Sequence, residues 1–318
     1  MLTLIVQRVL LSLVTLLIVS VVIFWATEVL PGDVATAILG REASPRSLER
    51  LREELGLDRP AFERYVDWLA GALRWDFGTS LARQDQAVSE LMGVRMRNTF
   101  ALAGLAALIG LPLALALGVV AGLTRDRLPD LLVSTLALIG QSLPEFVVGS
   151  LLILIFAVQL AIFPAVTLVN ADAPLAEIVP SMVLPVATLV IVMVAYIQRM
   201  VRSSMIDALA SEYVQMATLK GVPRRRVVLR HALPNALLPT INAVALTVAW
   251  LIGGVAVVET VFNYPGIGRL LVTAVGDRDL PLVQALGLLG ATIYITINLA
   301  ADLLTLALNP RLRTMARP

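Results

Sequence analysis

Long apolar runs alternate with short polar stretches along this chain, and several of the runs exceed about 18 residues. A helix of that length is enough to cross a bilayer hydrocarbon core of about 30 Å. We therefore expect an all-α polytopic membrane protein with six transmembrane helices. The expected spans are residues 9–29, 99–123, 131–163, 181–197, 238–258 and 280–306.

The segment between the first two expected spans differs from the rest, because it carries charges of both signs in helical patterns. Ser44 followed by Pro45 is typical of a helix start, and Gly56 is typical of a helix end. Two further helices are expected over 60–73 and 86–95. These patterns predict a small helical segment outside the membrane that packs on the spans.

The third expected span contains polar residues and a proline within its first half. Proline removes a backbone donor and kinks or breaks a helix, and the freed backbone groups must face protein or a water-filled cavity. An intramembrane carboxylate is costly, so Glu145 is expected either to face a cavity or to be paired. In the last span Asn298 is a second candidate for lining a cavity, whereas Asp302 is expected to pair with an arginine.

The basic residues indicate which side of the membrane each loop occupies. Six spans place both termini on one side, and the loops after the second and fourth spans lie on that side too. These regions are rich in arginine, whereas the short loops opposite contain only Arg269 and Arg278. The positive-inside rule therefore predicts that both termini are cytoplasmic and that the small helical segment after the first span is extracytoplasmic.

The stretch 212–239 is the longest polar interruption in the second half of the chain. The pattern of this stretch and of the residues before it predicts a helix over 203–219, ended by Lys220 and Gly221, and a second short helix over 224–233 that stops at Pro234. Two short helices joined by a glycine form a compact knob below the membrane. The residues alone leave two interpretations open: a helix lying on anionic lipid, or a docking surface for a cytoplasmic partner.

Composition excludes several kinds of function. The chain of 318 residues has no cysteine and one histidine, which argues against thiolate or histidine-rich metal sites and against disulfides. Its net charge of +2 gives no reason to expect a nucleic-acid partner. No G-x-x-x-x-G-K-[ST] phosphate loop occurs, so this chain is not expected to hydrolyse ATP.

Several motifs, in order along the whole chain, carry a family resemblance. The sequence resembles the membrane subunits of ABC importers, in the dipeptide/oligopeptide/nickel permease branch, and its long outer segment is similar to that of the B-type subunit of a pair. In the cytoplasmic loop the usual acidic–alanine–alanine triplet is replaced by Gln215-Met216-Ala217. The matching residues are Leu30-Pro31-Gly32-Asp33, Asp76 to Ser80, Glu212-Tyr213, Ala217, Lys220-Gly221, Leu229 to Leu233, Asn235 to Leu237, Pro239, Glu259, Phe262 and Tyr264 to Gly268.

The resemblance implies a permease subunit of the bacterial inner membrane that imports di- or oligopeptides. Its partners would be a homologous second permease, two cytoplasmic ATPases and an external substrate-binding protein, with ATP and Mg²⁺ held by the ATPases and no cofactor in this chain. Residues 1–97 would form the first span plus the outer segment, and 98–318 a five-helix core with a coupling loop at 203–234. Import of nickel or another small solute, a stand-alone secondary transporter and a membrane-embedded enzyme are the alternatives.

The resemblance also implies roles for individual residues, none of them catalytic and none a metal ligand. The residues expected to contact the ATPase are Glu212, Tyr213, Met216, Ala217, Thr218, Lys220 and Gly221. The residues expected along the translocation path are Gln141, Ser142, Pro144, Glu145 and Asn298. The residues expected to face the binding protein are Asp76, Gly78, Tyr264 and Gly266.

Overall fold

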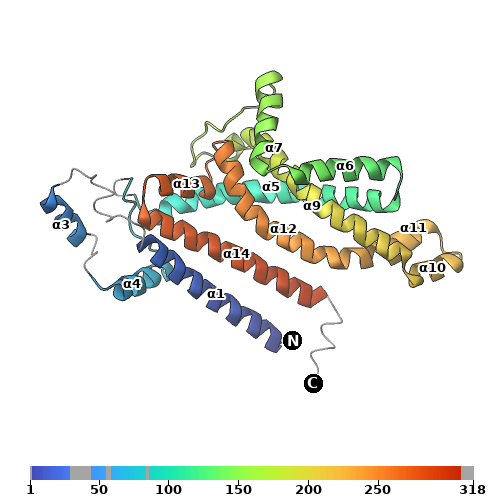
Figure 1. Cartoon of the computed structure of the whole chain (residues 1–318), viewed down its shortest axis with the longest axis horizontal. Coiled ribbons are helices and arrows are strands. Elements are labelled where there is room, and N and C mark those ends of the chain that lie inside the picture. Colours follow the sequence, from blue (N-terminus) through green and yellow to red (C-terminus); the bar gives the residue numbers. More distant parts are fainter. Residues whose placement is uncertain (1, 29–43, 55–58, 84–85, 309–318) are drawn as a thin grey trace.

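The computed structural model describes residues 2–28, 44–54, 59–83 and 86–308. The motif at 30–33, Gly56 and the basic residues of the C-terminal tail lie outside these ranges. Four helices are long and apolar enough to cross a membrane, or six spans result if each of two bent helix pairs counts as one. The membrane helices are α1 Leu2–Glu28, α5 Val88–Leu123, α6 Leu128–Ser142, α7 Glu145–Leu152, α9 Val183–Ala210, α12 Leu233–Val261 and α14 Leu280–Leu308 (Figure 1).

The outer helices α1 and α14 lie side by side and run in opposite directions (Figure 1). At one end Arg8 forms a salt bridge of 2.8 Å with Asp302, which confirms the expected arginine partner of this aspartate. At the other end Gln284 donates to the Thr27 hydroxyl at 2.7 Å. The pairing therefore has one register along its whole length.

Helices α5 and α9 run parallel and approach closely, because glycines of α5 face larger residues of α9. A Cβ added at Gly118 would lie 2.5 Å from the Cβ of Val201, and one at Gly122 would lie 2.6 Å from that of Met205. Such distances leave no room for a side chain, so the backbone of α5 itself forms the contact surface. Helix α6 returns antiparallel, with Gly140 against Ala195.

A buried ion pair fastens the turn between α5 and α6 to α9. Arg202 donates through Nε and Nη2 to the two carboxylate oxygens of Asp130, at 2.5 and 2.7 Å. The amide of Asp126 and the hydroxyl of Ser134 also donate to this carboxylate. Four donors therefore satisfy a carboxylate that is almost wholly removed from solvent.

The outer segment contains α3 Pro45–Glu54 and α4 Ala61–Leu73, and α4 packs on α1 as expected. The rings of Tyr65 and Trp68 lie 5.5 and 5.8 Å from that of Phe24, and the Tyr65 hydroxyl is 2.9 Å from the Ser20 hydroxyl. Phe62, one turn before Tyr65 on the same helix, is 76% exposed and takes no part in this contact.

The expected separate helix at 86–95 is wrong, because α5 continues without interruption from Val88 into the second span. The buried positions of α5 recur every three or four residues, so one buried stripe continues along the helix. The one longer interval, of two turns, lies between Met92 and Thr99, and Asn98 is buried beside Thr99 at its end. The division of the chain at residue 97 consequently falls inside this helix.

The third expected span is broken rather than merely kinked. Helix α6 ends at Ser142, Leu143 is extended, and α7 leaves at 107° to α6 before continuing as the π-helical turn η1 Ile153–Gln159 (Figure 1). Pro144 explains the break, because it lacks an amide donor and forces the residue before it away from helical angles.

The expected helix over 203–219 is divided at Ser211, which is extended, with ψ of 149°. Its carbonyl accepts hydrogen bonds from the amides of Val214 and Gln215 and so starts a new helix, α10 Glu212–Leu219. The Ser211 hydroxyl donates to the Ala208 carbonyl, a local side-chain bond of the kind that competes with helical backbone pairing. The second short helix does not stop at Pro234, because α11 Arg224–Arg226 and the π-helical turn η3 Val227–Ala232 continue directly into α12.

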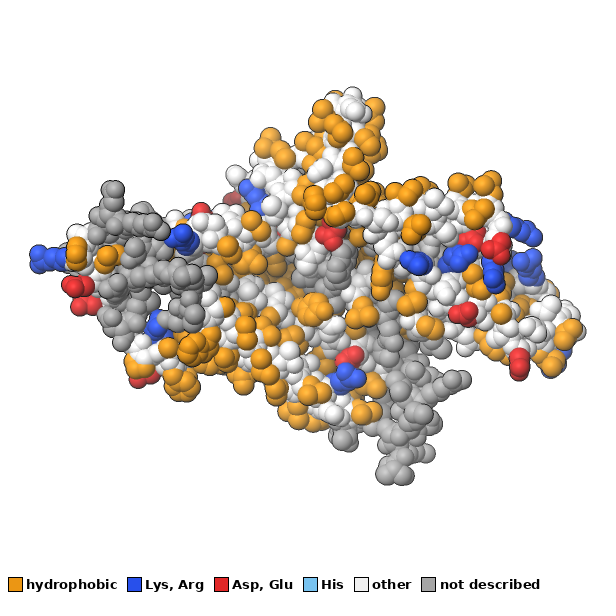
Figure 2. Space-filling model, in the orientation of Figure 1, with side chains coloured by type: hydrophobic (Ala, Val, Ile, Leu, Met, Phe, Trp, Pro, Cys, Tyr) orange, Lys and Arg blue, Asp and Glu red, His pale blue; other side chains and the backbone are white. Residues whose placement is uncertain are grey.

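Charged side chains gather toward the two ends of the molecule (Figure 2). Hydrophobic side chains cover most of the middle of the visible face (Figure 2). This distribution is the one expected when a bilayer surrounds the middle. The remaining elements lie at the end opposite α10 and are α8 Leu175–Ile178, the 3-10 turn η2 Val179–Met182 and α13 Ile267–Gly276.

Candidate functional site

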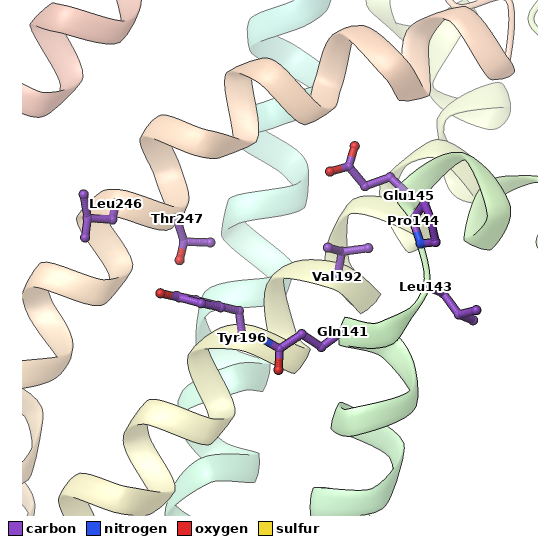
Figure 3. A pocket seen from close by; sticks show the side chains of 8 residues that line it. All are labelled: Gln141, Leu143, Pro144, Glu145, Val192, Tyr196, Leu246 and Thr247. Carbon is purple, nitrogen blue, oxygen red and sulfur yellow. The ribbon is translucent and has the colours of Figure 1, made fainter.

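A pocket of about 410 Å³ lies beside the break between α6 and α7. Helices α9 and α12 form its other walls (Figure 3). Its volume is within the range of about 300–1,000 Å³ typical of small-molecule sites. The lining residues are Gln141, Leu143, Pro144, Glu145, Val192, Tyr196, Leu246 and Thr247.

Glu145 begins α7, and its carboxylate extends toward α12 (Figure 3). The approach to that helix is close, because a Cβ at Gly254 would lie 3.2 Å from Glu145 Oε2. Among the described residues, no hydrogen bond or salt bridge involves this carboxylate. The glycine therefore leaves room for an acidic side chain that reaches the pocket without a protein partner.

The wall opposite Glu145 is polar as well. The ring of Tyr196 reaches from α9 toward Thr247 on α12 (Figure 3). Arg199, one turn further along α9, donates through Nη1 to the Oε1 of Gln141 at 3.2 Å. A basic side chain consequently lies next to the pocket at the end nearer α10.

The structure brings together only part of the expected translocation path. Gln141, Pro144 and Glu145 lie on one pocket wall, whereas Ser142 does not line it and donates to the Leu138 carbonyl at 2.7 Å. Asn298 lies on α14, where it donates to the Tyr294 carbonyl at 2.9 Å. Sequence reasoning missed Tyr196, although a phenol within an apolar span was an available signal.

The second candidate site is the knob, which we define as residues 211–232. Its first helix, α10, is followed by Lys220 and then by Gly221, whose φ of +74° lies in the left-handed region. The Gly221 amide donates to the Thr218 carbonyl at 3.0 Å, and the Val222 amide donates to the Ala217 carbonyl at 3.2 Å. These two bonds form a Schellman motif, and both Ala217 and Val222 pack against the same hydrophobic cluster.

Helix α10 has one face against the rest of the knob and one face in solvent. Val214 is buried, and Ala217 packs against the same hydrophobic cluster, which includes Met205 of α9. On the other face, Tyr213, Met216 and Leu219 are 45, 54 and 83% exposed. We call these three side chains the ridge. Because they recur every three residues, these side chains are neighbours on the helix surface. Helix α10 itself lies at one tip of the molecule (Figure 1).

The remaining expected contact residues surround the ridge. Glu212, Thr218, Lys220 and Gly221 are all exposed. Lys220 follows the last turn of α10, where a cation is favoured by the helix dipole. The structure thus places the expected ATPase-facing residues on one small surface, with Ala217 as the inward-facing member.

The motif at 259–268 forms a buried junction at the far end of the molecule. The Glu259 carboxylate accepts hydrogen bonds from the Thr99 hydroxyl at 2.5 Å and from the amides of Gly268 and Arg269 at 2.7 and 3.1 Å. Amides at a helix start bind anions favourably, so Glu259 fixes the start of α13 against α12 and α5.

This junction corrects the expectation that Tyr264 and Gly266 face the binding protein. Tyr264 is fully buried, its hydroxyl donates to the Asn98 carbonyl at 3.0 Å, and burial raises the pKa of its phenol above the usual range. Gly266 is buried too, because a Cβ there would lie 1.9 Å from Glu259 Oε1. Both residues therefore hold the junction together rather than present a surface.

The two other residues expected to face the binding protein are exposed. The Gly78 amide donates to the Asp76 carboxylate at 3.1 Å, and Gly78 has a φ of +74°, so the pair forms a tight turn. Next to it, the Ser80 hydroxyl donates to the buried carboxylate of Asp279 at the start of α14. The turn is therefore anchored to the membrane core.

Comparison with known proteins identifies the family. Residues 114–314 match the binding-protein-dependent transport system inner membrane component, and residues 1–103 match the N-terminal part of such membrane components. The glutathione transport system permease protein GsiC of Escherichia coli K12 is 38% identical over 313 residues, covering 98% of this chain and 99% of that protein.

GsiC of Salmonella typhimurium LT2 is 39% identical over the same lengths. The crystal structure of an amino acid ABC transporter with histidines is 17% identical, with a TM-score of 0.48 over 71% of this chain and 93% of that one. The family match covers most of the chain, and the GsiC similarity covers nearly all of it. The chain therefore belongs to the inner-membrane permease subunits of binding-protein-dependent ABC importers, in the dipeptide/oligopeptide family.

Proposed function

We propose that this chain forms one half of the translocation path of an ATP-driven importer of small peptides. The other half is a homologous permease, two cytoplasmic ATPases hold ATP and Mg²⁺, and an external binding protein delivers the substrate. This chain itself is non-catalytic and binds no cofactor. The relatives at 38–39% identity are named for glutathione transport, which supports a peptide substrate.

The observation that carries this proposal is the ridge on α10. Three large apolar side chains in solvent at the tip of a membrane protein are unfavourable unless a partner covers them. The inward face of α10 shares a hydrophobic cluster with α9, so a force on the ridge moves α9 as well. An ATPase that binds the ridge can therefore drive the membrane helices.

Cross-linking tests the partner directly, because the chain contains no cysteine. Within the complete transporter, we expect Met216→Cys to form a disulfide with a cysteine placed on the ATPase surface that faces the membrane subunits. Glu177→Cys, an exposed site at the opposite end, serves as the control. Equal cross-linking yields at both positions would contradict the proposed contact.

Uptake tests the substrate. Proteoliposomes that contain both permeases and both ATPases, supplied with binding protein, are expected to accumulate glutathione or a tripeptide only when ATP is present. Nickel uptake without peptide uptake would select the alternative cargo. Uptake by this chain alone, without the ATPases, would show instead a stand-alone transporter.

A further inference from the structure

Two side chains of opposite charge, one lining the pocket beside the α6–α7 break and one next to it, have no salt-bridge partner among the described residues. Glu145 extends into the pocket from one wall, and Arg199 lies at the end nearer α10. Among the described residues, neither side chain forms a salt bridge, whereas Arg202, one turn from Arg199, is fully paired with Asp130. A charge without a partner at the start of a membrane helix is costly, so Glu145 suits the cationic end of a ligand, and the exposed Arg199 next to the pocket suits the anionic end of the same ligand.

The stretch of α9 from the pocket-lining Val192 to Arg199 has the length of a short peptide. Val192, Tyr196 and Arg199 share one face of α9, because they follow at intervals of four and three residues. Helix α9 rises about 10 Å between Val192 and Arg199. An extended peptide covers about 3.3–3.6 Å per residue, so about three residues match this rise.

The groups between the two charges suit a peptide backbone. Gln141, Tyr196 and Thr247 offer amide and hydroxyl groups that can donate to or accept from peptide bonds. Leu143, Val192 and Leu246 supply apolar surface for side chains. A metal ion fits poorly, because Glu145 is the only acidic residue on this described wall and no histidine lines it.

On the basis of the importer function proposed above, we propose that this pocket binds both ends of a short zwitterionic peptide. The Glu145 carboxylate takes the amino terminus as an ammonium group, and the Arg199 guanidinium takes the terminal carboxylate. The peptide consequently lies along α9 with its carboxyl end toward the knob. This pocket would be a membrane subsite for peptides, separate from the selection made by the binding protein.

Blocked peptides test each contact separately. In proteoliposomes with the complete transporter and binding protein, initial uptake is compared for trialanine, N-acetyl-trialanine and trialanine amide. We expect Glu145→Gln to reduce the preference for the free over the acetylated amino end about tenfold, and to leave the preference for the free carboxyl end unchanged. Arg199→Gln is expected to show the converse pattern.

The preference of each variant, meaning its uptake of free peptide divided by its uptake of blocked peptide, is divided by the same preference of the wild type. The binding protein is the same in both, so its own selectivity cancels in this ratio. Glu177→Gln and Arg125→Gln, exposed and outside the pocket, are the matched controls and are expected to keep both wild-type preferences. Equal loss of uptake for all three peptides, or unchanged preferences in both variants, would overturn the subsite. If the wild-type transporter takes up none of the peptides, the importer function fails and the subsite fails with it.

Discussion

The end of α10 allows a prediction whose size follows from the backbone alone. Gly221 has a left-handed φ of +74°, and a Cβ at this position would have no other atom within 4 Å. A side chain therefore meets no steric obstacle, and only the backbone conformation is penalised. That penalty is roughly 1–2 kcal/mol for an L-residue, less for asparagine and more for a β-branched residue. We expect the knob to weaken in the order Gly221→Asn, Gly221→Ala, Gly221→Val.

Hydrogen exchange measures this weakening where it occurs. The amides of residues 221 and 222 donate to the carbonyls of Thr218 and Ala217, so their protection reports the Schellman motif. A cost of roughly 1–2 kcal/mol corresponds to about 5- to 30-fold faster exchange. In the assembled transporter, peptide uptake per ATP hydrolysed is expected to fall in the same order, because α10 no longer transmits force to α9.

Gly276→Ala is the matched control. Gly276 also has no atom within 4 Å of an added Cβ, but its φ is not left-handed. Hydrogen exchange around residue 276 is therefore expected to stay unchanged or to slow slightly in Gly276→Ala. If all three Gly221 variants exchange at the wild-type rate, the left-handed termination does not stabilise the knob. If exchange changes as expected but uptake per ATP does not, the knob is not the coupling element.

Two further predictions concern the membrane core. Gly118→Ala places a Cβ 2.5 Å from that of Val201, so we expect the free energy of unfolding to fall by about 1–3 kcal/mol and the melting temperature in detergent to fall with it. The control Gly104→Ala, which has nothing within 4 Å of the added Cβ, is expected to melt close to wild type. Equal melting temperatures for the two variants would refute the close approach of α5 and α9. Glu259→Gln removes the charge that binds the amides of Gly268 and Arg269, so we expect the free energy of unfolding to fall by about 1–3 kcal/mol and proteolysis at 262–268 to become faster. The control Glu177→Gln is expected to be cleaved at the wild-type rate. Wild-type proteolysis of Glu259→Gln would show that the carboxylate does not hold the junction.

The sequence predicts the helical membrane fold because hydrophobic length is a strong local signal. It also predicts the interruption at Pro144, since the missing donor acts locally. It does not predict the continuity of α5 beyond residue 97 or the division at Ser211. Both depend on tertiary packing: the buried stripe of α5 continues from Val88, and Val214 must turn inward to reach the cluster with Met205.

The candidate sites show the same division between local and tertiary information. The turn at Gly221 follows from local pattern, whereas the exposure of Tyr213 and Met216 does not, because the helical pattern puts them on one apolar face with the buried Met205. The burial of Tyr264 does not, because its hydroxyl bonds to Asn98, which lies 166 residues away in the chain. In the sequence Arg199 is one of the arginines that follow the fourth span, and its place beside the pocket depends on how α6 packs against α9.

The knob is joined covalently to two walls of the pocket. Helix α9 enters it at Ala210, and η3 leaves it directly into α12, which carries Leu246 and Thr247. The third wall, α6, has no such chain connection and follows α9 through the Asp130–Arg202 pair instead. A single displacement of the knob therefore moves two walls of the pocket at once, while α6 follows through its noncovalent contacts with α9, the ion pair among them.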